Sequence, residues 1–169
     1  MISNIALKGK VVRLALLDMV LLAAACLIPA ASHLFAVPLY MLNPMLALLL
    51  AGVLFGRDWR NALVLAVLMP LVSCLVTGMP AVPKMVCMMA ELATVVGLFS
   101  VFERRWGAAL AVFPAIVAGK VIYYALKAII LAPAVLVGTE WWMQLAAVLL
   151  WGGLFAMLNS KGVKRSERK

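Results

Sequence analysis

Residues 57–80 read RDWRNALVLAVLMPLVSCLVTGMP. Seventeen consecutive residues, 61–77, carry no charge and lie between the basic pair Arg57 and Arg60 on one side and a Gly-Met-Pro turn on the other. A segment of about 17 to 25 mostly apolar residues is long enough to cross the hydrocarbon core of a bilayer as one helix. The stretch therefore predicts a membrane-spanning helix over residues 61–77.

The same alternation of apolar segments with charged or Pro/Gly boundaries continues through the chain. It predicts an all-α integral membrane protein: a single domain over residues 1–169, built as a bundle of six transmembrane helices. The predicted helices cover residues 11–31, 37–56, 61–77, 84–102, 107–131 and 141–158. A cleavable signal peptide is the alternative for the first segment, because three basic residues precede its apolar run. The five apolar segments that follow favour a retained spanning helix.

The composition supports a membrane location. The chain of 169 residues is 67% hydrophobic and 12% charged, whereas a soluble domain is roughly 45–50% apolar and about 25% charged. These values exclude a soluble enzyme or a nucleic-acid-binding protein. The formal net charge of +9 is therefore interpreted as membrane topology rather than as an affinity for nucleic acid.

The basic residues predict the direction of the helices. Six spans bring twelve of the fifteen Lys and Arg residues to one side, and the positive-inside rule makes that side the cytoplasm, with both termini inside. These residues are Lys8, Lys10, Arg13, Arg57, Arg60, Arg104, Arg105, Lys161, Lys164, Arg165, Arg168 and Lys169. The opposite, outer side holds three connections rich in Pro and Gly, at residues 31–40, 77–84 and 131–141. We therefore expect a functional site at the outer face.

Two of the predicted helices carry charges inside the membrane. Lys84 and Glu91 are seven residues apart on one helix face, and so are Lys120 and Lys127. At 1.5 Å per residue, Glu91 and Lys120 both lie about 10–13 Å below the outer end, so they can pair if the two helices are neighbours. One interpretation is a structural ion pair with two lysines that reach the surface. The other is an outward-facing polar pocket for an anionic ligand.

Further polar residues are candidates for contacts with a ligand, each with a simpler alternative. His33, Tyr40 and Asn43 lie near the first outer connection, where interfacial polar residues are common. Tyr123 and Gln144 lie in the outer parts of the last two predicted helices. Asp18 lies inside the first predicted helix, and we expect it to pair with a basic residue at the cytoplasmic rim.

The sequence lacks the usual patterns of catalysis. It has one His, no HExxH motif, no paired carboxylates at helical spacing and no P-loop, and its three cysteines are scattered. We therefore expect no enzymatic activity, no cofactor and no metal, and an ATPase would have to be another subunit.

Residues 70–80, PLVSCLVTGMP, followed by Lys84, Met88 and Glu91 within MVCMMAEL at 85–92, carry a family resemblance. The chain resembles the substrate-binding S components of energy-coupling factor (ECF) vitamin transporters. The helix count and chain length are similar over most of the sequence, and only residues 70–97 carry a recognisable motif. The first predicted helix departs from the family, because it lacks alanines spaced four apart.

The resemblance implies a function. S components capture a vitamin or related micronutrient at the outer face of the bacterial or archaeal cytoplasmic membrane. They then act with a transmembrane coupling subunit and two cytoplasmic ATPases. The implied ligand contacts are Gly78, Met79, Lys84, Met88 and Glu91, whereas Lys120, Tyr123 and Lys127 rest on the positions of charge alone. The surplus lysines favour an anionic micronutrient.

Two alternative functions are also compatible with the sequence. A structural or scaffolding membrane subunit of a cell-envelope assembly would need no small-molecule ligand, and its Glu91 and Lys120 would form a plain ion pair. A small membrane enzyme that acts on lipids is less favoured, because paired acidic residues and His clusters are missing.

Overall fold

The computed structural model contains six α-helices and, among the residues that it describes, no β-strand. The described residues are 2–34, 42–56, 58–131 and 141–166. The helices are α1 (Ile2–Leu34), α2 (Pro44–Gly56), α3 (Trp59–Thr77), α4 (Val82–Trp106), α5 (Ala108–Leu131) and α6 (Trp141–Ser166). The prediction of an all-α chain with six helices is confirmed.

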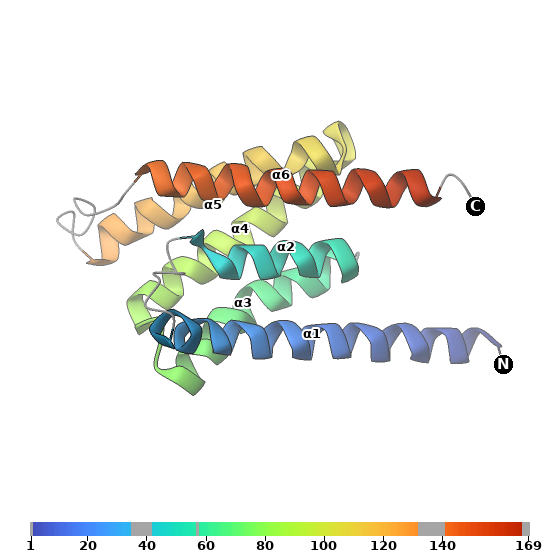
Figure 1. The fold of residues 1–169 in the computed structure, drawn as a ribbon, viewed down its shortest axis with the longest axis horizontal. Helices are drawn as coiled ribbons and strands as arrows, with labels where there is room; N and C mark the ends of the chain where they lie inside the picture. Colours follow the sequence, from blue (N-terminus) through green and yellow to red (C-terminus); the bar gives the residue numbers. More distant parts are fainter. Residues whose placement is uncertain (1, 35–41, 57, 132–140, 167–169) are drawn as a thin grey trace.

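The helices lie side by side along the long axis of the molecule, and both ends of the chain lie at the same end of the bundle (Figure 1). We call this the termini end, and the opposite end the distal end. α4 packs most extensively against α5 and also contacts α3. α1 contacts α2 and α3, and α2 contacts α3 and α6. α2 thus lies between the α1–α3 side of the bundle and α6.

Five of the six helices are long and apolar enough to cross a bilayer. The qualifying segments are Val11–Ser32, Trp59–Thr77, Val82–Trp106, Ala108–Leu131 and Trp142–Ser160. Large apolar side chains cover the outside of the bundle; Leu75 and Ile129, for example, are 76% and 79% exposed. Soluble proteins seldom expose so large an apolar surface. These features indicate a multi-pass membrane protein whose helices face lipid.

The second helix differs from its prediction. A helix over residues 37–56 was expected, but α2 begins at Pro44 and has 13 residues, a length of about 20 Å. Asn43, directly before it, has a φ of 49°, a left-handed conformation that cannot continue a helix and that Asn tolerates better than most residues. Pro44 is suited to the first helical position because it needs no hydrogen-bond acceptor there. Residues 37–41 lie outside the described residues.

The other helices are close to their predictions, except at the two ends of the chain. α1 begins at Ile2 instead of residue 11, and α6 continues to Ser166 instead of residue 158. The prediction counted only apolar residues that fit within a bilayer. Charged helical turns can continue into water beyond the hydrocarbon, so these two helices were predicted too short.

A single residue, Gly107, joins α4 to α5. Its φ is 74°, in the region that glycine adopts without strain, and its N–H donates to the carbonyl oxygen of Glu103 at 3.0 Å. So short a joint makes α4 and α5 antiparallel neighbours. Gly119 then allows close contact between them, because a Cβ there would lie 2.5 Å from Cγ2 of Val95 and 3.0 Å from the backbone oxygen of Glu91.

We expect Gly119→Ala to destabilise the protein. The added methyl group would overpack the α4–α5 contact at a cost of about 1–3 kcal/mol, and the better helix propensity of Ala would offset about 1 kcal/mol of this. Thermal unfolding in detergent should show a lower melting temperature. Gly97→Ala is the matched control in α4, because a Cβ there would meet no atom within 4 Å. Equal melting temperatures for the two variants would contradict the close contact.

Candidate functional site

Three polar side chains meet inside the bundle at Glu91, which is 2% exposed. Lys120 Nζ lies 2.9 Å from Glu91 Oε1, and Asn43 Nδ2 donates to the same oxygen at 2.8 Å. The predicted pairing of Glu91 with Lys120 is confirmed. A buried charge costs several kcal/mol unless it is paired and hydrogen-bonded, and here the carboxylate has both an ammonium and an amide donor.

The three side chains come from separate parts of the chain that the fold brings together. Glu91 lies in α4 and Lys120 in α5, next to the close contact at Gly119. Asn43 precedes α2, and the indole N–H of Trp151 in α6 donates to the carbonyl oxygen of its neighbour Leu42. The start of α2 is therefore bound to α4 on one side and to α6 on the other.

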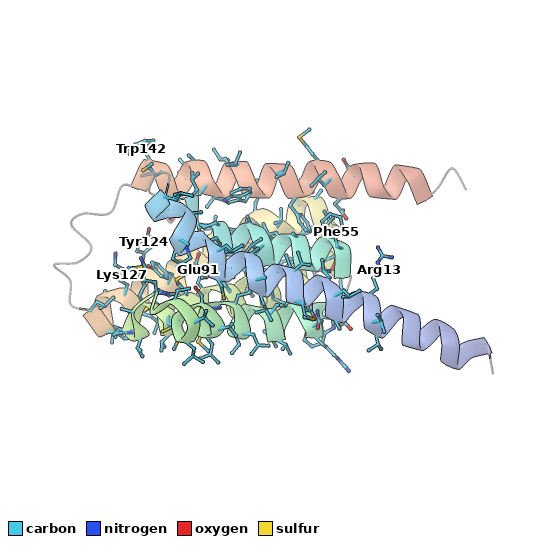
Figure 2. All side chains as sticks on the ribbon, turned by 60° about the horizontal axis from the view of Figure 1, so that its bottom comes forward. Arg13, Phe55, Glu91, Tyr124, Lys127 and Trp142 are labelled. Carbon is cyan, nitrogen blue, oxygen red and sulfur yellow. The ribbon has the colours of Figure 1, made fainter. Side chains whose placement is uncertain are left out.

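Lysine and tyrosine side chains extend this cluster toward the distal end. Lys120 Nζ lies 5.7 Å from the ring centroid of Tyr123, and Lys127 Nζ lies 5.9 Å from that of Tyr124. The two tyrosine rings meet edge to face, with centroids 5.2 Å apart. Glu91, Tyr124 and Lys127 lie in the same part of the bundle, near Trp142, whereas Phe55 and Arg13 lie toward the termini end (Figure 2).

Lys84 completes the set of charges in this region. It lies in the first turn of α4, is half-buried, and is level with Lys127 of α5, because both are seven residues from the Glu91–Lys120 ion pair in the distal direction. We define the distal polar cluster as Asn43, Lys84, Glu91, Lys120, Tyr123, Tyr124 and Lys127. Its members lie on α4, on α5 and directly before α2.

The turn between α3 and α4 has its own hydrogen bonds. Gly78 ends α3 with a φ of 71°, and its N–H donates to Cys74 O at 2.9 Å. Ser73, which is fully buried, donates through Oγ to the carbonyl oxygen of Met79 at 2.9 Å, and Thr77 Oγ1 donates to Ser73 O at 2.7 Å. Most of the S-x-x-x-T-G-M motif is thus used to hold this turn. Met79 itself remains exposed.

The remaining predicted residues fall outside the cluster. Met88 packs against the apolar core. Gln144 is partly buried in α6. The backbone of His33 lies in the last turn of α1, but its side chain lies outside the description, and so does the whole of Tyr40.

Asp18 has a different partner from the one expected. Its Oδ1 accepts a hydrogen bond from Nδ2 of Asn61 in α3 at 2.8 Å, so the predicted pairing with a basic residue is corrected. Asn61 directly follows Arg60 in the first turn of α3 and is partly buried. An amide is less costly to bury there than a charge. The contact ties α1 to α3.

Three hydrogen bonds of this region were not predicted from the sequence. They join the Ser73 hydroxyl to the Met79 carbonyl, the Trp151 indole to the Leu42 carbonyl, and the Asn43 amide to the Glu91 carboxylate. The sequence offers one signal, Asn43 before Pro44, which favours a helix start at that point. The three contacts themselves depend on the fold. Among the described residues no group of three His, Cys, Asp or Glu side chains could hold a metal ion.

A comparison of the chain with protein families, with curated proteins and with solved structures finds no match. The function of the site is therefore inferred from its residues and their contacts.

We expect the removal of one partner of the buried ion pair to be far more damaging than the removal of both. Glu91→Gln leaves the Lys120 ammonium without its counter-charge, and Lys120→Met leaves the carboxylate with the amide of Asn43 alone, at about 3–5 kcal/mol each. The double variant should recover most of the loss. A double-mutant cycle by thermal unfolding measures the coupling. Additive losses would show that the pair contributes nothing as a pair.

We expect Ser73→Ala to loosen the α3–α4 turn. The loss of the hydroxyl that binds the Met79 carbonyl should cost about 1 kcal/mol and raise amide hydrogen exchange at residues 78 and 79. Ser100→Ala is the control, because Ser100 Oγ donates to Gly97 O within its own helix. Unchanged exchange in the Ser73 variant would mean that the turn is held without this hydroxyl.

Proposed function

We propose that the chain is the substrate-binding S component of an ECF-type importer, which captures a vitamin or related micronutrient at the outer face of the membrane. The observation that carries the proposal is the distal polar cluster itself. A membrane bundle that needs only stability can use the buried ion pair and its amide, but it has no use for two further lysines and two tyrosines at the same end. Charged residues within membrane segments usually mark a ligand or ion pathway.

The proposal includes six membrane crossings with both termini in the cytoplasm. α2 is shorter than the roughly 30 Å hydrocarbon core, but the return of the chain to the termini end requires an even number of passes. Exposed basic residues at the termini end, among them Arg13, Arg60 and Arg105, agree with a cytoplasmic side. The distal polar cluster then faces outward, where a micronutrient arrives.

The arrangement supports binding and release, without chemistry of its own. The energy for import would come from two cytoplasmic ATPases that act through a transmembrane coupling subunit, as the resemblance of residues 70–97 to S components implies. The turn at Gly78 and Met79 would border the ligand, since it leads from α3 directly into the helix that carries Lys84 and Glu91.

A scaffolding subunit of a cell-envelope assembly is the second candidate. The pairing of Glu91 with Lys120 and Asn43 favours it, because these groups satisfy one another and need no ligand. The two candidates differ in what they predict for Lys84 and Lys127, which a scaffold could lose without consequence.

We expect the full chain, purified with a tag from membranes of its own source in mild detergent, to carry a coupling subunit and two ATPases in stoichiometric amounts. Mass spectrometry identifies the partners, and ATP-dependent uptake of radiolabelled vitamins into proteoliposomes measures transport. A tagged unrelated membrane protein of similar size controls for non-specific capture. Recovery of cell-wall synthesis enzymes, together with absence of ATPases and of uptake, would favour the scaffold instead.

A further inference from the structure

The distal half of the chain has a surplus of positive charge that does not depend on how individual side chains are paired. Of the six acidic residues, only Glu91 and Glu140 fall in the distal half of the sequence-defined bundle; the other four are Asp18, Asp58, Glu103 and Glu167. Three lysines fall in the same half: Lys84, Lys120 and Lys127. Whatever Glu140 contacts, three ammonium groups face at most two carboxylates.

One of the two carboxylates, that of Glu91, already has an ion-pair partner. Glu91 Oε1 holds both Lys120 Nζ and Asn43 Nδ2 at 2.8–2.9 Å, in a site with almost no exposure. Its negative charge is therefore balanced within the bundle. The remaining pair of lysines, Lys84 and Lys127, shares at most one carboxylate.

Lys84 and Lys127 lie on helices that pack together, and each is seven residues from one member of the Glu91–Lys120 ion pair, toward the distal end. The register that this ion pair defines therefore brings the two lysines to the same level of the bundle. Both are half-buried, so water screens the repulsion between their charges less than at an open surface. Lys127 is also held over the ring of Tyr124 at 5.9 Å. Two half-buried ammonium groups held close together are stabilised by an anion between them.

We propose that the ligand of the distal polar cluster carries an anionic oxygen group, a carboxylate or phosphate, which binds between Lys84 and Lys127 beside the ring of Tyr124. This inference rests on the proposed function and adds the chemical class of the substrate. The surplus charge selects an acid over a neutral or cationic micronutrient, and the tyrosine pair offers a ring face or edge to the rest of the molecule.

A soluble molecule is favoured over the headgroup of an anionic lipid. The most exposed residues of this part of α5 are apolar and include Val121 and Ile129, and this face is the one that lipid covers. Lys127 is less exposed than these residues and belongs to the side of α5 that carries Tyr123 and Tyr124. The anion site therefore lies off the apolar face.

The test uses the purified full chain in neutral detergent and three matched pairs of compounds: nicotinate and nicotinamide, pantothenate and panthenol, and pyridoxine 5′-phosphate and pyridoxine. Each is titrated at constant ionic strength against the melting temperature. We expect at least one acid to stabilise the protein with an affinity at least about tenfold above that of its neutral counterpart, since a charge-assisted hydrogen bond is worth this much. In a separate experiment, the melting temperature is measured in micelles that contain phosphatidylglycerol or phosphatidylcholine.

Variants identify the site. Lys84→Gln with Lys127→Gln should abolish the preference for the acid, and Lys84→Arg with Lys127→Arg, which keeps both charges, should retain most of it. Arg105→Gln, at the other end of α4, removes one exposed charge and should leave the preference unchanged. The melting temperature of each variant without ligand shows whether it is folded.

Three results would overturn the anionic class: equal responses to acid and neutral compounds in all three pairs, an unchanged preference in the Gln variant, or protection by phosphatidylglycerol alone. Stabilisation by a neutral or cationic micronutrient, with none by the acids, would refute this inference but leave the proposal of an S component standing. Failure of the coupling subunit and ATPases to co-purify would instead refute the proposed function, even if the acids bind.

Discussion

The contact on which the bundle depends is the buried ion pair between Glu91 of α4 and Lys120 of α5. It requires the two helices to be close, which the one-residue joint at Gly107 and the missing side chain at Gly119 allow. It also determines what else can lie nearby, because an ion pair removed from water needs further hydrogen bonds. Asn43 supplies one and so links the start of α2 to α4. The polar interior is therefore part of how the helices are arranged.

Much of this arrangement could be predicted because it depends on position along a helix. Apolar length predicts the helices, and depth below the helix ends predicts that Glu91 and Lys120 can meet. The start of α2 could not be predicted in this way, since the left-handed backbone of Asn43 depends on contacts with α4 and α6 that are distant in sequence. The role of Ser73 could not be predicted either. Its hydroxyl donates to the carbonyl oxygen of Met79, and only the conformation of the turn brings these two groups together.

The distal polar cluster divides into two parts with different physical roles. Its deep part, around Glu91, is electrically balanced and almost fully buried, so any change there alters the packing of α2, α4 and α5 together. Its outer part, around Lys84 and Lys127, is half-buried and carries like charges. A balanced interior supports a site without selecting a ligand, whereas the charges nearer the surface select among ligands. The same residues thus fit both a structural and a binding function, at different depths.

The single-residue joint between α4 and α5 also bears on how the protein is made. Two helices that must meet at Gly107 can leave the ribosome and enter the membrane as one hairpin, in which Glu91 and Lys120 already lie opposite each other. Each charge alone would oppose its own insertion by about 2.5–3.5 kcal/mol at mid-membrane. Entering as a neutral pair, the two residues reduce this barrier, so a contact that holds the mature bundle together also assists its biogenesis.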